Sequence, residues 1–257
     1  MNRLRLLWRR HIVERHRIPA PLWQSAVSQL RIVSALEVVE RQRLHDLASR
    51  FLRAKTIVGA HDLEVTDEMR VSIAAQACLL ILNLGLDYYT GWYEVIVYAR
   101  GFLVDAEEYD DAGVVHRHAQ ELDGEAWESG PVILSWQDAR PGARPHGEGS
   151  NVVLHEFAHK LDMLNGAANG MPPLHENMSR PEWTEALSSA YRDLNERLDQ
   201  NRPTDIDPYA AESPAEFFAV LTELFFEAPR RLFDAYPRVY HAFMDFYLQD
   251  PMRRIGR

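Results

Sequence analysis

Cysteine is almost absent from the sequence: Cys78 is the only one among 257 residues. A lone cysteine excludes a disulfide within the chain, and it excludes a zinc site built from several cysteines. Because Cys78 lies inside the longest apolar stretch, residues 71–86, we predict a buried thiol. Chains without disulfides are typical of a reducing compartment, so we expect the protein to be cytoplasmic.

Long hydrophobic runs are missing as well. The stretch at 71–86 contains polar residues and is shorter than the roughly 20 residues that a membrane-spanning helix needs. Near the N-terminus, only the short run Leu6–Trp8 stands where a secretory signal would have its apolar core. We therefore predict neither a membrane span nor a signal peptide.

Basic residues are fewer than acidic ones: the sequence has 28 Lys and Arg but 38 Asp and Glu, which gives a net charge of −10. Binding along a nucleic acid needs basic side chains to neutralise the phosphates, so we predict no direct contact with nucleic acid. The exception to this deficit is the Arg-rich N-terminal end, residues 1–17. It is either a contact region for an acidic partner or for lipid headgroups, or a solvated terminus.

The rest of the composition is that of a globular protein, with 46% apolar and 26% charged residues. We predict one domain over residues 1–257, with a helical, Arg-rich N-terminal region to about residue 54. The expected fold class is α+β, mainly helical with a small β-sheet. We expect helices over 23–53 (broken near Ser34 and Ala35), over 66–85 and over about 151–165, and strands over 93–98, 113–119 and 132–136.

The chemistry is concentrated in the helix expected at about 151–165. His155, Glu156 and His159 form the pattern H-E-x-x-H, which is typical of the active-site helix of zinc hydrolases. Residues four apart share one face of a helix, so both imidazoles can bind one cation while Glu156 reaches a water beside it. By chance, this composition would produce the pattern about 0.04 times. The alternative is a pair of partly exposed histidines on an amphipathic helix.

A catalytic zinc ion needs a third protein ligand and a position left for water. Spacing alone does not choose this ligand. Glu182 and Glu216 each follow a serine by three residues and so complete a capping box, which explains both without a metal. The candidates for the third ligand are His175, Glu176, Glu182, Glu185 and Glu216.

Other polar residues near the motif have more than one interpretation. Asp162 is either a hydrogen-bond partner for an imidazole N–H or an ordinary helix carboxylate. His116 and His118 share one face of an expected strand and could bind a metal, although two ligands without a nearby carboxylate make a poor site. A serine hydrolase has little support because Ser150 lacks the pattern G-x-S-x-G, and we predict that Ser150 is the N-cap of the zinc-binding helix.

Several blocks of sequence, taken in order along the chain, carry a family resemblance. The main blocks are His155–Asp162 (HEFAHKLD), Tyr209–Leu221 (YAAESPAEFFAVL), Phe225–Pro229 (FFEAP) and Phe246–Pro251 (FYLQDP). With these blocks the chain resembles the Mlc titration factor A family, also called the DgsA anti-repressor family of zinc metallopeptidases. The resemblance covers most of the chain from about Phe51 onward and is weakest at the Arg-rich N-terminal end.

The resemblance implies a zincin-type fold in which His155, His159 and Glu216 bind one zinc ion per chain. It also implies that Glu156 is the general base and that Tyr209 stabilises the oxyanion. The chemistry agrees, because zinc lowers the pKa of bound water to about 7 and a nearby carboxylate can then take the proton. Taken alone, Tyr209 would more often be a packing residue, and its place before Glu216 is compatible with either role.

Two functions from different classes follow from these features. The first is a zinc-dependent peptidase, aminopeptidase-like by resemblance, that hydrolyses peptide substrates. The second is an anti-repressor, a binding protein that sequesters a Mlc-type transcriptional repressor of the sugar-uptake (glucose phosphotransferase) system, with a structural or regulatory zinc. The two are compatible, because a catalytic site and a binding surface are separate parts of a protein.

Overall fold

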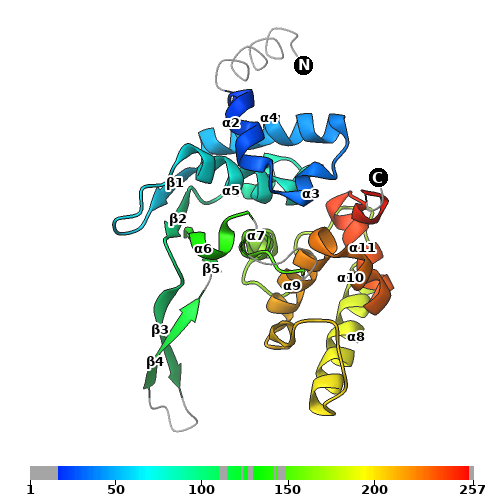
Figure 1. The fold of residues 1–257 in the computed structure, drawn as a ribbon. Helices are drawn as coiled ribbons and strands as arrows, with labels where there is room; N and C mark the ends of the chain where they lie inside the picture. Colours follow the sequence, from blue (N-terminus) through cyan, green and yellow to red (C-terminus); the bar gives the residue numbers. More distant parts are fainter. Residues whose placement is uncertain are drawn as a thin grey trace.

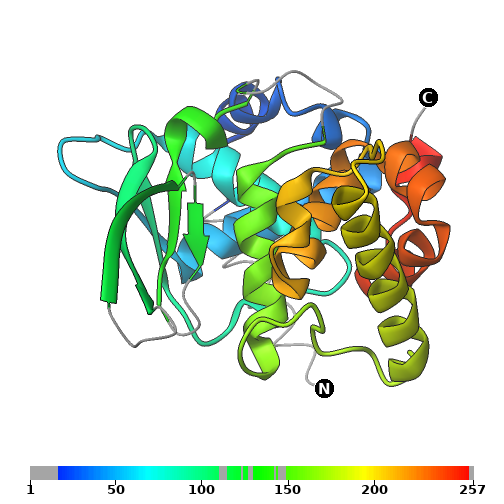
Figure 2. The same cartoon turned by 90° about the horizontal axis from the view of Figure 1, so that it is seen from below.

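The computed structural model describes residues 17–109, 115–122, 124–126, 130–141, 143 and 149–254. Helix α7 (Val152–Asp162) lies in the middle of the fold (Figures 1 and 2). The N-terminal helices and a small sheet lie on one side of it, and the C-terminal helices on the other. The predicted mainly helical chain with a small sheet is confirmed. The predicted helix and contacts of residues 1–16 lie outside the described residues.

The N-terminal part of the described chain is helical, as expected. The predicted break near Ser34 and Ala35 separates α3 from α4, and α4 begins with a reciprocal capping box between Glu37 and Glu40. A second break, between α2 and α3, was not predicted. The bounds are α2 Ala20–Val27, α3 Arg31–Ser34, α4 Val38–Ala54 and α5 Asp67–Leu80.

Helix α5 is buried on nearly all sides and packs against α2, α4 and α7. It begins as predicted at Thr66, whose side chain accepts the N–H of Met69 at 3.2 Å. Its predicted end at Gly85 is wrong, because the backbone leaves the helix at Ile81. Gly85, at φ +95°, instead closes the next turn by donating its N–H to the carbonyl of Ile81 at 2.8 Å.

A four-stranded sheet packs beside α7 in the order β1-β2-β6-β5. Strands β1, β2 and β6 are parallel, and β5 pairs with β6 in the antiparallel direction. The strands predicted over 93–98 and 132–136 are confirmed as β2 and β6, whereas β1 and β5 were not predicted. The bounds are β1 Thr56–Gly59, β2 Glu94–Tyr98, β5 Gly124–Ala126 and β6 Val132–Ser135.

Strands β3 (Phe102–Tyr109) and β4 (Val115–Leu122) form a separate antiparallel pair that extends away from the helices (Figure 1). The strand predicted over 113–119 overlaps β4, and residues 113 and 114 lie outside the described residues. Strand β3 was not predicted because its acidic residues are unfavourable for strands. His116 and His118 lie on β4. Their side chains lie outside the described part, so the alternative metal pair stays a prediction.

The C-terminal helices pack against one another and against α7 (Figure 2). Helix α8 contacts α9 and α11, and α9 also contacts α7 and α10. The shorter helices connect these elements to each other and to the sheet. The bounds are η1 Leu86–Tyr89, α6 Trp136–Ala139, η2 Met163–Asn165, α8 Arg180–Asp199, η3 Pro208–Ala211, α9 Pro214–Glu227, α10 Pro229–Ala235, α11 Pro237–Tyr247 and η4 Pro251–Arg254.

One cluster of buried apolar side chains runs from Ile18 to Tyr247 and includes residues of the N-terminal helices, the sheet and the C-terminal helices. Cys78 belongs to this cluster, as predicted, and burial raises the pKa of its thiol. Within the residues that the structure describes, no helix has both the length and the apolar character to cross a membrane.

Candidate metal centre

Helix α7 brings the H-E-x-x-H residues into the interior. The side chain of Asn151 accepts the N–H of Leu154 at 3.1 Å, so Asn151 is the N-cap and the prediction of Ser150 is wrong. His155, Glu156 and His159 are all buried. The alternative of two partly exposed histidines on a surface helix is therefore wrong.

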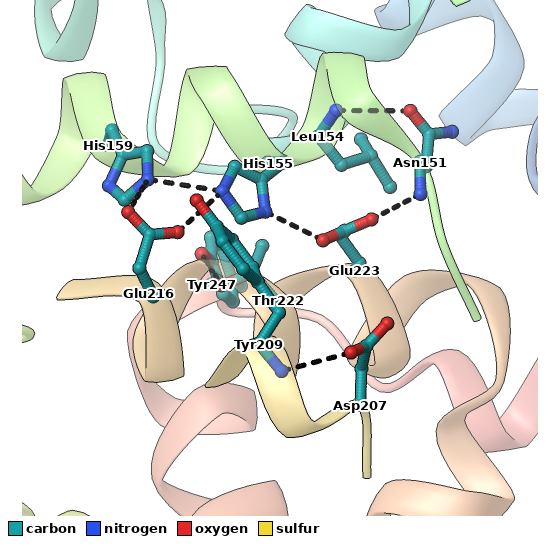
Figure 3. A network of polar contacts seen from close by, with 10 residues as sticks. All are labelled: Asn151, Leu154, His155, His159, Asp207, Tyr209, Glu216, Thr222, Glu223 and Tyr247. Atoms are coloured by element: carbon teal, nitrogen blue, oxygen red, sulfur yellow. Dashed lines mark hydrogen bonds and ion pairs between the residues drawn. The ribbon is translucent and has the colours of Figure 1, made fainter. Parts of the chain in front are cut away.

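Helix α9 brings in the carboxylate that faces the two histidines. Its N-cap is Ser213, whose hydroxyl accepts the backbone N–H of Glu216 at 3.1 Å, and Pro214 occupies its first turn. Only the backbone of Glu216 takes part in this cap. Its carboxylate extends toward α7 (Figure 3). The capping interpretation and the ligand interpretation of Glu216 are thus compatible.

The other candidates for the third ligand lie elsewhere. His175 Nε2 bonds the carbonyl of Phe246 at 2.8 Å. Glu176 and Glu182 are exposed, and the backbone of Glu182 takes part in the cap of α8. Glu185 is exposed and lies 3.9 Å from an arginine of α11, Arg238. Of the five predicted candidates, the structure brings only Glu216 to the histidine pair.

The three side chains converge on one point between α7 and α9 (Figure 3). His155 Nε2 lies 2.9 Å from Glu216 Oε2 and 3.2 Å from His159 Nε2. His159 Nε2 lies 3.4 Å from Glu216 Oε1. One ligand atom from each residue lies within 4.8 Å of the other two. The arrangement joins residues that are 61 positions apart in the sequence.

The hydrogen bonds between Glu216 and the two histidines shift the pKa values of Glu216 and His155. Burial raises the pKa of Glu216, but its hydrogen bonds to His155 and His159 outweigh burial and hold this pKa far below its usual range. Burial lowers the pKa of His155, but the hydrogen bonds to Glu216 and Glu223 outweigh it and hold this pKa well above its usual range. Without a metal, the pair therefore consists of an imidazolium and a carboxylate.

The donor set fits a zinc ion. Two imidazole nitrogens and one carboxylate oxygen are a known catalytic zinc set, and they leave a fourth position for water. Tetrahedral zinc with bonds of about 2.0–2.1 Å places its ligand atoms about 3.3 Å apart. The contacts of 2.9, 3.2 and 3.4 Å between these three side chains are close to that spacing. A zinc ion between them would take the place of the proton that His155 shares with Glu216 in the metal-free protein.

Glu156 lies on α7 beside the ligand atoms without joining them. Its Oε2 atom is buried and has no hydrogen-bond partner among the described residues. Burial raises its pKa to about 7, against the opposing charges of His155 and His159. In the metal-free protein, this carboxyl group can therefore exchange a proton near neutral pH.

Tyr209 approaches the centre from the short helix η3. Its backbone N–H bonds Asp207 Oδ1 at 3.0 Å, and its ring centroid lies 6.0 Å from that of His155. Burial, followed by the charge of Glu216, raises the pKa of its hydroxyl, so the group stays protonated. The residue as a whole is 39% exposed, and its hydroxyl points toward His155 and Glu216 (Figure 3). Tyr209 is therefore placed as a hydrogen-bond donor beside the three side chains.

Sequence reasoning missed a second carboxylate at the centre. Glu223 is not among the residues predicted for the site, but its Oε1 lies 2.7 Å from His155 Nδ1. Its spacing of two helical turns from Glu216 was the available signal. Asp162 bonds loop backbone instead of an imidazole: its Oδ2 accepts the N–H groups of Asn169 at 2.8 Å and Gly170 at 2.7 Å.

A known family and several named proteins match this chain over nearly its whole length. The sequence profile of the family described as "Glucose-regulated metallo-peptidase M90" matches residues 4–248. The chain is 38% identical over 238 residues to a protein named Mlc titration factor A from Klebsiella pneumoniae (strain 342), covering 91% of this chain and 88% of that one. It is 39% identical over 240 residues to the Mlc titration factor A of Escherichia fergusonii, covering 91% and 88%.

A third relative is the Mlc titration factor A of Serratia proteamaculans, with 38% identity over 238 residues, 91% of this chain and 89% of that one. The profile match and the relatives agree with one another and with the His-His-Glu arrangement described above. The chain belongs to the glucose-regulated metallopeptidase M90 family.

Proposed function

We propose that the protein is a zinc-dependent peptidase of zincin type in which His155, His159 and Glu216 bind one zinc ion. The single observation that supports this most strongly is the convergence of three electron-rich ligand atoms from two helices, within 4.8 Å of one another. Two imidazoles and a carboxylate suit zinc better than the oxygen-preferring cations Ca²⁺ and Mg²⁺.

The remaining residues supply the acid–base chemistry. A bound zinc ion supplies a Lewis acid that activates water and polarises a carbonyl group. Glu156, which is buried beside the two histidines, would take the proton from the attacking water as a general base. Tyr209 keeps its hydroxyl proton and donates a hydrogen bond to the oxyanion that forms from the substrate carbonyl.

The substrate class and cellular setting are also proposals. We infer peptide substrates and an aminopeptidase-like preference from the family resemblance. We infer a cytoplasmic location from the near-absence of cysteine. A single domain over residues 1–257 is supported by the one apolar cluster that joins both ends of the described chain.

Metal analysis together with a Glu156→Gln variant tests the proposed peptidase. The wild-type protein is expected to contain one zinc per chain and to cleave members of a peptide library. Glu156→Gln is expected to keep the zinc but lose hydrolysis, because an amide cannot accept the proton from the water. His155→Ala and His159→Ala are expected to lose tight zinc binding. Stoichiometric zinc in both histidine variants, or full activity of Glu156→Gln, would overturn the proposal.

The names of the relatives support a second function. The relatives are named Mlc titration factor A, and we propose that this chain likewise binds a transcriptional repressor of the Mlc type. Glu156→Gln removes one proton acceptor inside the centre and leaves the outer surface unchanged. A pull-down with this inactive variant is therefore expected to recover the repressor. If the Arg-rich N-terminal end contacts the repressor, less repressor should be recovered at high salt, because salt screens the attraction between charges. Recovery of no repressor at low salt would leave only the peptidase.

A further inference from the structure

Glu223 is a buried charged group at the centre that the proposed reaction does not use. It lies on α9, and its carboxylate faces α7 (Figure 3). Its Oε1 bonds His155 Nδ1 at 2.7 Å, and its Oε2 accepts the backbone N–H of Asn151. Both contacts are made to the same helix that carries the histidine pair. Glu223 therefore touches the metal-binding residues without offering an oxygen to the metal position.

The contact with His155 decides which nitrogen of that ring carries a proton. A carboxylate only accepts hydrogen bonds, so Nδ1 of His155 must be the donor. When the ring gives up its second proton, the lone pair is left on Nε2, the atom that faces His159 and Glu216. An imidazole with the opposite tautomer would present an N–H group to the metal and could not bind it.

Glu223 is itself held in place by a network at the start of α7. Asn151 caps α7 with its side-chain oxygen, and its Nδ2 donates to Gln76 Oε1 at 2.9 Å and to Glu227 Oε1 at 2.8 Å. One residue thus links α5, α7 and α9. Because Glu223 accepts from the backbone of that same residue, its carboxylate cannot shift without breaking the bond to Asn151.

The two histidines differ in this respect. Nδ1 of His159 is buried and has no hydrogen-bond partner among the described residues. Among the described residues, a carboxylate therefore holds the Nδ1 atom of His155 but not that of His159. Glu223 therefore fixes the orientation of the His155 ring. Removing Glu223 should weaken metal binding by His155 and leave the orientation of His159 unchanged.

We propose that Glu223 is a positioning residue for metal binding: it holds His155 as the Nδ1–H tautomer and fixes α9 against the start of α7. The inference rests on the proposed zinc site. Glu223 thus affects metal affinity through the tautomer of His155, and it affects folding separately through the packing of α9 against α7.

Zinc affinity of Glu223→Gln, measured by competition with a chromophoric chelator, tests the proposal. The amide group of glutamine can face His155 with a donor, which favours the wrong tautomer, and the affinity is expected to fall about 10–100-fold. Glu227→Gln is the matched control, because Glu227 lies one turn further along α9 and also bonds Asn151. Glutamine at position 227 keeps a side-chain oxygen that can accept the N–H of Asn151, so the control is expected to keep its zinc affinity within about twofold of the wild type.

A second measurement uses the wild-type protein, so that it holds even if Glu223→Gln does not fold. Nitrogen-15 NMR of the zinc-loaded protein is expected to show the proton of His155 on Nδ1. A proton on Nε2, or an unchanged zinc affinity in folded Glu223→Gln, would overturn the role of Glu223. A wild-type protein that binds no zinc at all would instead overturn the proposed function, so the two failures are distinguishable.

Discussion

Glu216 has two tasks at once, since its backbone N–H completes the cap of α9 while its carboxylate faces both histidines. The capping pattern in the sequence was therefore real and did not argue against a ligand. The same pattern at Glu182 has no such second contact in the structure described, where this residue is exposed at the start of α8. Two residues with equal local sequence signals thus differ only in what the fold places opposite them.

This difference predicts unequal effects of two alanine substitutions. Glu216→Ala should weaken zinc binding by more than the roughly 10–100-fold that follows loss of an outer partner, because a ligand itself is lost. Glu182→Ala should cost only about 0.5 kcal/mol of stability from the first turn of α8 and leave zinc affinity unchanged. Zinc titration and urea denaturation of both variants measure the two effects. The opposite ranking would show that Glu216 is not the third ligand.

In the metal-free protein, burial raises the pKa of Glu156 to about 7, and this makes the stability of the fold depend on pH. The folded state keeps the proton of Glu156 up to about pH 7, whereas the unfolded chain loses it near the ordinary value of 4.5. Stability from this group is thus present below pH 4.5 and is lost as the pH rises to about 7, by up to about 3 kcal/mol. Glu156→Gln has no such loss.

The metal-free Glu156→Gln protein should therefore gain stability over the metal-free wild type as the pH rises. Urea denaturation of both proteins at pH 5 and pH 8 measures the change. All other ionisable groups are the same in both proteins, so their contribution to the difference largely cancels. A stability difference that is the same at both pH values would mean that Glu156 is not held in a strongly desolvated position.

The segment between α7 and α8, residues 163–179, contacts both helices of the centre. Asp162, at the end of α7, accepts two backbone N–H groups of this loop. Gly170, at φ +78°, lies against the first turn of α9, where an added Cβ would come 2.6 Å from the carbonyl oxygen of Pro214. Pro214 is two residues before Glu216. The loop therefore takes part in setting the distance between α7 and Glu216, the proposed third ligand.

Gly170→Ala should lower stability by about 1–3 kcal/mol and should also weaken zinc binding, because α9 must move away from the new methyl group. Gly91→Ala is the control. Gly91 has a similar φ of +89°, but an added Cβ meets nothing within 4 Å. It should show backbone strain alone, with unchanged zinc affinity. Thermal denaturation and chelator competition separate the two effects, and equal zinc affinity in both variants would argue against the loop's role.

The elements differ in how far sequence alone could predict them. Helix α7 and the start of α5 were predictable because their signals are local: an apolar pattern and a capping residue. Strands β1 and β5 were not, since each is short and forms only by pairing with β2 or β6. The contact between Glu223 and His155 could not be predicted from the sequence either, because it depends on how α9 packs against α7.

At the scale of the whole molecule, the proposed zinc site joins helices that the chain places far apart. A zinc ion held by both α7 and α9 binds the folded state and not the unfolded one, so it should stabilise the fold. At a free zinc concentration of about 100 times the dissociation constant, the gain is about 2.7 kcal/mol.

Removing the metal with a chelator should accordingly lower the unfolding temperature of the wild-type protein, and adding zinc back should restore it. The variant His155→Ala serves as control, because it should unfold at the same temperature with and without zinc. Calorimetry of the four samples measures both differences. An equal shift in the variant would mean that the stabilising zinc is bound somewhere else.

The separation of 61 residues between His155 and Glu216 also has a consequence for protein synthesis. Ribosomes release the chain from its N-terminus, so the histidine pair emerges well before the third ligand. A chain that stops early, or is cut before α9, carries an incomplete ligand set. Under the proposed function, such fragments should not hydrolyse peptides, so incomplete chains would not act as peptidases in the cell.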